Sequence, residues 1–127
     1  MMNTCLVDTN VLSGLLSRDE FYLKGVEKYL DFRWAISAMT EFELWLYREK
    51  YDFPRKAFVD FLEPLVVFPL ERDVFELAAK LFSKRKQPKP HMADLLIVAT
   101  AILHDLPLLT ADKDMKKYSQ AEVVVLK

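Results

Sequence analysis

The chain has 127 residues, of which 52% are hydrophobic and 29% charged, so it can bury the core of a single domain spanning residues 1–127. Its 18 lysines and arginines nearly balance its 19 aspartates and glutamates, which excludes a partner held by bulk positive charge but not nucleic acid bound at a local patch. The single cysteine, Cys5, excludes an intramolecular disulfide, and no signal peptide or segment near the ~20 apolar residues of a membrane span is visible, which favours a cytoplasmic protein.

The first third of the chain alternates short apolar runs with amphipathic ones. Thr4–Val7 is expected to form a buried strand, followed by a helix over 11–16 and a second amphipathic stretch over 21–32. A second strand is expected over 34–37. A helix should then follow over 40–50, since Leu44 and Tyr47 fall on one helical face.

The same alternation continues through the middle of the chain. Pro54 suits the start of a helix over 55–62, and 65–70 is expected to be a third strand. A strong helix is expected over 73–86, followed by a stiff loop at 87–90, where two prolines stand.

The last third begins with a segment over 93–104 that is apolar nearly all round, which predicts a buried helix. Short strands are expected over 107–109 and 123–126. Strands that alternate with helices predict a mostly parallel sheet covered on both faces, an α/β fold. In such folds functional sites form at the carboxyl ends of the strands.

Four acids stand just past a predicted strand or near the start of a predicted helix: Asp8, Glu43, Asp94 and Asp112. Each has a plain structural explanation, because Asp is a favoured helix cap, Thr40 with Glu43 fits a capping box, and acids suit a first helical turn. A parallel sheet, however, would bring all four to one edge. Carboxylates gathered in this way repel one another, and a hard divalent cation such as Mg²⁺, or Mn²⁺ in its place, would relieve the repulsion.

The segments around these acids resemble, in order, the four motifs of the PIN-domain nucleases. The segments are Val7-Asp8-Thr9-Asn10, Ile36-Ser37 with Thr40-Glu41-Phe42-Glu43-Leu44, Ala93-Asp94-Leu95-Leu96-Ile97-Val98-Ala99-Thr100-Ala101, and Leu109-Thr110-Ala111-Asp112-Lys113-Asp114-Met115. The chain's size and compactness resemble the VapC-type toxins of toxin–antitoxin pairs.

The resemblance implies a three-layer α/β/α fold with a parallel sheet of about five strands in the order 3-2-1-4-5. It also implies a magnesium-dependent endoribonuclease, with RNA as substrate, a cognate antitoxin as partner and a homodimer as assembly. By motif match the catalytic, metal-binding acids are Asp8, Glu43, Asp94 and Asp112. The same match gives candidates for contact with substrate phosphate, or for support of the acids, at Thr9, Asn10, Thr110 and Asp114. Glu41 competes with Glu43, and the spacing from Thr40 favours Glu43.

Two other functions remain open from the sequence. One is a non-catalytic module that binds RNA or protein through the same fold, and the other is a phosphohydrolase that uses Asp8 as its nucleophile. A basic run from Lys80 to Lys89 is either a solvated helix end or a rim for RNA phosphates. Aromatic residues between Phe42 and Phe61 belong either to the core or to a groove for an antitoxin helix or a second copy.

Overall fold

The computed structural model describes residues 3–85 and 91–127, and its centre is one parallel sheet. The strands run in the order β3-β2-β1-β4-β5, which confirms the predicted 3-2-1-4-5 arrangement. Their bounds are β1 (Thr4–Val7), β2 (Arg33–Ser37), β3 (Val66–Phe68), β4 (Leu108–Thr110) and β5 (Val123–Val125). Leu6 of β1 is in register with Ala35 on one side and Leu108 on the other, so β1 lies at the centre of the sheet.

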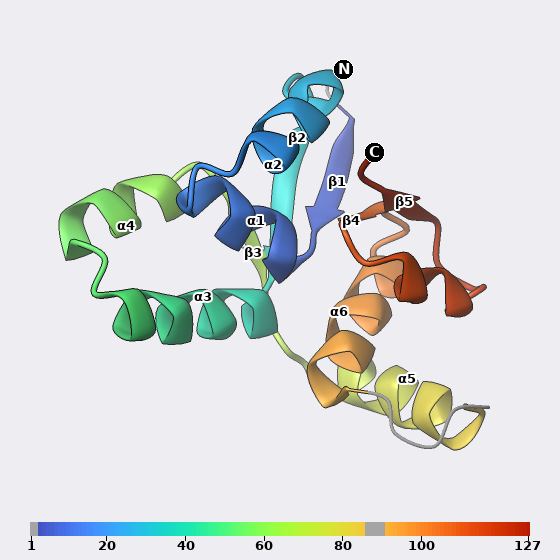
Figure 1. Cartoon of the computed structure of the whole chain (residues 1–127). Coiled ribbons are helices and arrows are strands. Elements are labelled where there is room, and N and C mark those ends of the chain that lie inside the picture. The colour runs from blue at the N-terminus through green and yellow to red at the C-terminus, as the bar shows by residue number, and fades with distance from the viewer. Residues whose placement is uncertain (1–2, 86–90) are drawn as a thin grey trace.

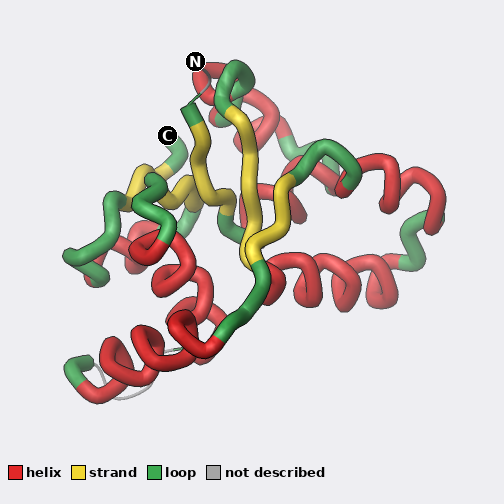
Figure 2. The backbone as a smooth tube through the Cα atoms, turned by 180° about the vertical axis from the view of Figure 1, so that it is seen from behind, coloured by secondary structure: helices red, strands yellow, loops and turns green. Residues whose placement is uncertain are grey.

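Helices cover both faces of this sheet (Figure 1; Figure 2). They are α1 (Thr9–Leu16), α2 (Glu20–Gly25), α3 (Ala38–Tyr51), α4 (Arg55–Leu62), α5 (Arg72–Ser83) and α6 (Met92–Leu103), with 3-10 helices η1 (Glu27–Tyr29) and η2 (Lys113–Lys117). The predicted three-layer α/β/α fold is therefore confirmed. No helix in the described ranges is both long and apolar enough to cross a membrane.

The alternation of side chains along β1 divides the hydrophobic core in two. Leu6 points into a cluster formed with α5, α6 and η2, whereas Cys5 and Val7 point into a second cluster formed with α1, α3 and α4. Strand residues that are apolar on both faces are what a sheet buried between two helical layers requires. Helix α6 is buried almost all round, as expected, because it packs between the sheet and α5.

Two predicted helices begin or break elsewhere. The stretch 21–32 is not one helix, because α2 ends at Gly25 and the chain passes through η1 before β2. Helix α3 begins at Ala38 rather than Thr40, because Ser37 at the end of β2 caps it by accepting a hydrogen bond from the Met39 backbone N–H. The proposed capping box of Thr40 and Glu43 is therefore wrong, and both side chains are available for contacts outside the helix.

Smaller differences lie at other helix ends. Helix α1 begins at Thr9, not at residue 11, because Asp8 caps it. Helix α5 ends at Ser83, where the backbone N–H of Lys84 bonds back to the carbonyl of Lys80, so its predicted extension to residue 86 is wrong. The predicted stiff loop at 87–90 lies outside the described residues, as do Lys86 and Lys89 of the basic run.

Candidate functional site

Asp8 stands at the end of the central strand and is almost completely buried, with 4% of its surface exposed. The Thr9 backbone N–H donates to its Oδ1 at 2.8 Å, which caps α1. The Thr110 hydroxyl donates to its Oδ2 at 2.7 Å from the end of the neighbouring strand β4. Asp8 therefore is a helix cap, as its plain structural explanation held, and is also held by a residue far along the chain.

Asn10 and Thr110 join the carboxyl ends of β1 and β4 around Asp8. The Asn10 side-chain amide lies 3.4 Å from Asp8 Oδ2 and 3.3 Å from Thr110 Oγ1, and its oxygen accepts from the Ala111 backbone N–H at 3.1 Å. Thr110 Oγ1 also accepts from the Asp112 backbone N–H at 3.1 Å. Because Thr110 is fully buried, its hydroxyl serves to orient Asp8 and the turn that carries Asp112.

Glu43 lies in the second turn of α3 and faces the start of α1. The Thr9 hydroxyl donates to Glu43 Oε1 at 2.6 Å, and Thr40 Oγ1 lies 3.1 Å from the same hydroxyl. Glu41 instead accepts from the indole N–H of Trp45 at 3.2 Å, on its own helix. Of the two competing glutamates, Glu43 is thus the one tied to the residue next to Asp8.

The other two acids occupy helix starts on the opposite side of Asp8. Asp94 is half-buried in the first turn of α6, and Asp112 caps η2 by accepting from the Asp114 backbone N–H at 2.9 Å. Asp114 itself is exposed. The carboxyl ends of the parallel strands therefore bring the predicted acids to one edge of the sheet, next to the starts of α1, α3 and α6 (Figure 1).

Electrostatics show that these acids interact. Burial raises the pKa of Asp8, the Thr110 and Thr9 hydrogen bonds lower it, and the negative charges of Asp94 and Asp112 raise it further. Burial also raises the pKa of Asp94, as do Asp112 and Glu43, while His91 and Lys117 lower it. The four carboxylates thus act as one charged group whose members oppose each other's ionisation.

The donor set suits a hard divalent cation, because every candidate ligand is an oxygen. Within residues 3–85 and 91–127, no three His, Cys, Asp or Glu side chains lie close enough together to hold an ion among themselves. Magnesium is ordinarily held by one or two carboxylates together with water and substrate oxygens, so it does not need such a cage. By donor type and charge, the residues present fit Mg²⁺, and Asp8, Asp94 and Asp112 are the ones that would hold it.

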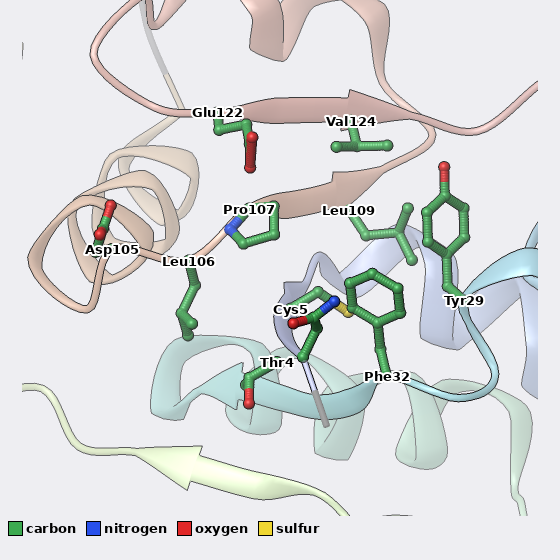
Figure 3. Close-up of a pocket in the computed structure, with 11 residues that line it drawn as sticks. Thr4, Cys5, Tyr29, Phe32, Asp105, Leu106, Pro107, Leu109, Glu122 and Val124 are labelled. Atoms are coloured by element: carbon green, nitrogen blue, oxygen red, sulfur yellow. The ribbon is translucent and has the colours of Figure 1, made fainter. Parts of the chain in front are cut away.

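A separate pocket of about 600 Å³ lies at the other end of the strands (Figure 3). Its walls come from the amino ends of β1, β4 and β5 and from the aromatic rings of Tyr29 and Phe32. Cys5 lines it, but burial raises the pKa of this thiol to about 11, so it stays protonated and is no nucleophile at neutral pH. The pocket contains none of the four acids.

Two residues near the acids escaped the sequence reasoning, namely Lys117 and Tyr118 at the end of η2. Lys117 lowers the pKa of Asp94, and the carboxylates of Asp94 and Asp112 raise that of Tyr118. The only sequence signal was their position shortly after Asp112. Of the predicted basic run, Lys80 lies 3.8 Å from Glu76, and Arg85 stacks on Phe82 and donates to its carbonyl at 2.8 Å.

The chain was compared with known proteins. The PIN domain family profile matches residues 5–121, whereas no curated protein matches. A toxin–antitoxin complex from Klebsiella pneumoniae contains a chain 28% identical to this one, with a TM-score of 0.79 and coverage of 95% of this chain and 96% of that one. FitAcB from Neisseria gonorrhoeae is 26% identical, with a TM-score of 0.76 and coverage of 97% and 96%. VapBC2 from Rickettsia felis, bound to a promoter DNA fragment, is 19% identical, with a TM-score of 0.81 and coverage of 98% and 99%.

Proposed function

Because this chain belongs to the PIN-domain family, we propose that it is a metal-dependent endoribonuclease and the toxin of a type II toxin–antitoxin pair. The observation that carries the proposal is the gathering of acids from positions 8, 43, 94 and 112 at one edge of the sheet, where their charges interact. Such a group is suited to hold a cation against an anionic substrate, and RNA is a substrate of that charge.

In this proposal Asp8, Asp94 and Asp112 hold Mg²⁺, for which Mn²⁺ can substitute. The ion supplies charge stabilisation at the scissile phosphate and acidifies bound water. Thr110 and Asn10 keep the Asp8 carboxylate aimed, and Thr9 fixes one oxygen of Glu43 at 2.6 Å. The other oxygen of Glu43 orients the attacking water. Addition of water breaks the bond between phosphorus and the 3′-oxygen, leaving a 5′-phosphate and a 3′-hydroxyl.

A phosphohydrolase that uses Asp8 as nucleophile fits this arrangement less well. Both Asp8 oxygens accept hydrogen bonds, from Thr9 and from Thr110, and only 4% of the residue is exposed. A carboxylate that attacks phosphorus needs one free oxygen facing the substrate. A carboxylate that orients or charges a metal site can use oxygens that also accept hydrogen bonds.

The toxin role rests on the likeness to the Klebsiella chain, which comes from a toxin–antitoxin complex. The proposal includes an antitoxin as partner, a homodimer as assembly, the cytoplasm as location and one nuclease domain over residues 1–127. Co-expression tests the antitoxin part: growth should stop when this chain is expressed alone and resume when the open reading frame next to its gene is added.

The nuclease part is tested with end-labelled RNA incubated with the purified protein. We expect cleavage with Mg²⁺ or Mn²⁺, none with EDTA, and fragments that carry 5′-phosphates. Asp8→Asn should abolish cleavage. Asp60→Asn is the matched control, since Asp60 forms an exposed pair with Lys56 and should leave cleavage unchanged. RNA binding without turnover under saturating Mn²⁺ would instead support a non-catalytic module.

A further inference from the structure

Tyr118 ends η2, the 3-10 helix that Asp112 begins. Its ring packs in the core cluster of α5 and α6, beside residues such as Leu95 and Met115, and only 9% of the residue is exposed. Its hydroxyl oxygen is buried and has no hydrogen-bond partner among the described residues. A buried hydroxyl without a partner is uncommon in folded proteins, because it loses its bonds to water and gains none.

The surroundings of this hydroxyl are those of the acidic site. The side chains whose charges act on it are Asp94 and Asp112, the acids that stand at the starts of α6 and η2. Burial and these two negative charges raise the pKa of Tyr118, so the phenol remains protonated at neutral pH. It is therefore a neutral donor, fixed by its packed ring beside the proposed metal-binding carboxylates.

We propose that Tyr118 is a substrate-binding residue whose hydroxyl donates a hydrogen bond to a phosphate oxygen of the RNA strand held at Asp94 and Asp112. This inference rests on the proposed function. Tyrosine hydroxyls are among the ordinary donors to nucleic-acid phosphates, which accept most protein hydrogen bonds in such complexes. A phenol adds a donor beside the acids without adding a positive charge, so it does not compete with the carboxylates for the cation.

The test measures RNA binding in a background without cleavage. Asp8→Asn protein is titrated into a labelled single-stranded RNA in Mg²⁺, and fluorescence anisotropy gives the dissociation constant. Adding Tyr118→Phe should weaken binding about tenfold, the effect of losing one hydrogen bond to a charged acceptor. Adding Tyr51→Phe is the matched control and should change nothing, because Tyr51 is exposed at the far end of α3.

Two further readouts separate this role from a structural one. The salt dependence of binding should keep its slope, because a neutral donor releases no counterion, whereas a lysine would change the slope by about one. The melting temperature of Tyr118→Phe should equal or exceed that of the wild type, because an unpaired buried hydroxyl is lost.

Equal affinity of the two backgrounds, absence of RNA binding, or a clear fall in the melting temperature of Tyr118→Phe would overturn the inference. Failure of the proposed function is seen separately, as absence of cleavage by the wild-type protein in Mg²⁺. A wild type that cleaves RNA together with a Tyr118→Phe variant of unchanged affinity refutes only the role of Tyr118.

Discussion

The Thr110 hydroxyl donates a 2.7 Å hydrogen bond to Oδ2 of Asp8 across 102 positions of sequence. The bond joins the ends of two neighbouring parallel strands, β1 and β4, at the edge where the acids gather. Both residues are buried, so water does not replace the bond if it is lost. The orientation of Asp8 therefore depends on Thr110 as much as on its own strand.

Thr110→Val should separate this role from simple packing. It keeps the shape of the side chain but leaves Asp8 Oδ2 and the Asp112 backbone N–H without their Thr110 partner. We expect a loss of about 1–3 kcal/mol in the free energy of unfolding, measured by urea denaturation. RNA cleavage should fall by roughly tenfold or more, as for other residues that orient metal ligands. Thr110→Ser, which retains the hydroxyl, should stay close to wild type; equal losses in both variants would show that the methyl group matters instead.

The metal-free protein should lose stability as pH rises. The folded chain raises the pKa of Asp8, through burial and then through Asp94 and Asp112, and likewise that of Asp94. The folded state therefore holds protons that the unfolded state has released. The stabilisation that these protons provide is complete below the ordinary Asp pKa and is lost as pH rises through the raised values. Urea denaturation in EDTA should show this decline, and Asp8→Asn, which cannot titrate, should make it shallower. An identical pH profile for both proteins would contradict the prediction.

The two glutamates of α3 should differ in function. Glu43 accepts from Thr9, next to Asp8, whereas Glu41 accepts from Trp45 on its own helix. Glu43→Gln should reduce the rate constant of RNA cleavage by about a hundredfold or more, the usual effect of losing a group that orients or activates water. Glu41→Gln is the matched control and should retain nearly full activity. The assignment fails if Glu41→Gln is the more damaging change.

Mg²⁺ should stabilise the fold, because it relieves repulsion among the carboxylates and binds only the folded chain. At a hundredfold excess over its dissociation constant, an ion adds about 2.7 kcal/mol to the free energy of unfolding. A thermal melt should therefore move upward in Mg²⁺ and return in EDTA. The shift should shrink in Asp94→Asn and persist in Asp60→Asn. Equal shifts in the two variants would place the ion elsewhere.

The fold was predictable from the sequence because the strands are short, apolar and separated by helical segments. The run Thr4–Val7 and the helix Arg55–Leu62 were expected with the bounds that the structure gives them. The parallel sheet then implied that Asp8 and Asp112 reach the same edge, and their mutual effect on pKa agrees with this. Local pattern and topology pointed to the same arrangement, as consistent sequences should.

Other features depend on tertiary contacts that no local pattern contains. Ser37 could be interpreted as a strand residue, but its hydroxyl also caps α3, which moved the helix start away from Thr40. Tyr118 has the ordinary pattern of a core aromatic. Its relation to Asp94 arises only when η2 packs on α6, so spacing could not have indicated it.

The most direct test of the central claim is anomalous diffraction from a crystal of this protein soaked in Mn²⁺. We predict a peak bounded by carboxylate oxygens of Asp8, Asp94 and Asp112, with water completing the coordination. The peak should be absent from crystals of Asp94→Asn. A peak bound by other residues, or none at these acids in the wild type at saturating Mn²⁺, would contradict the proposed metal site and with it the assignment as a ribonuclease.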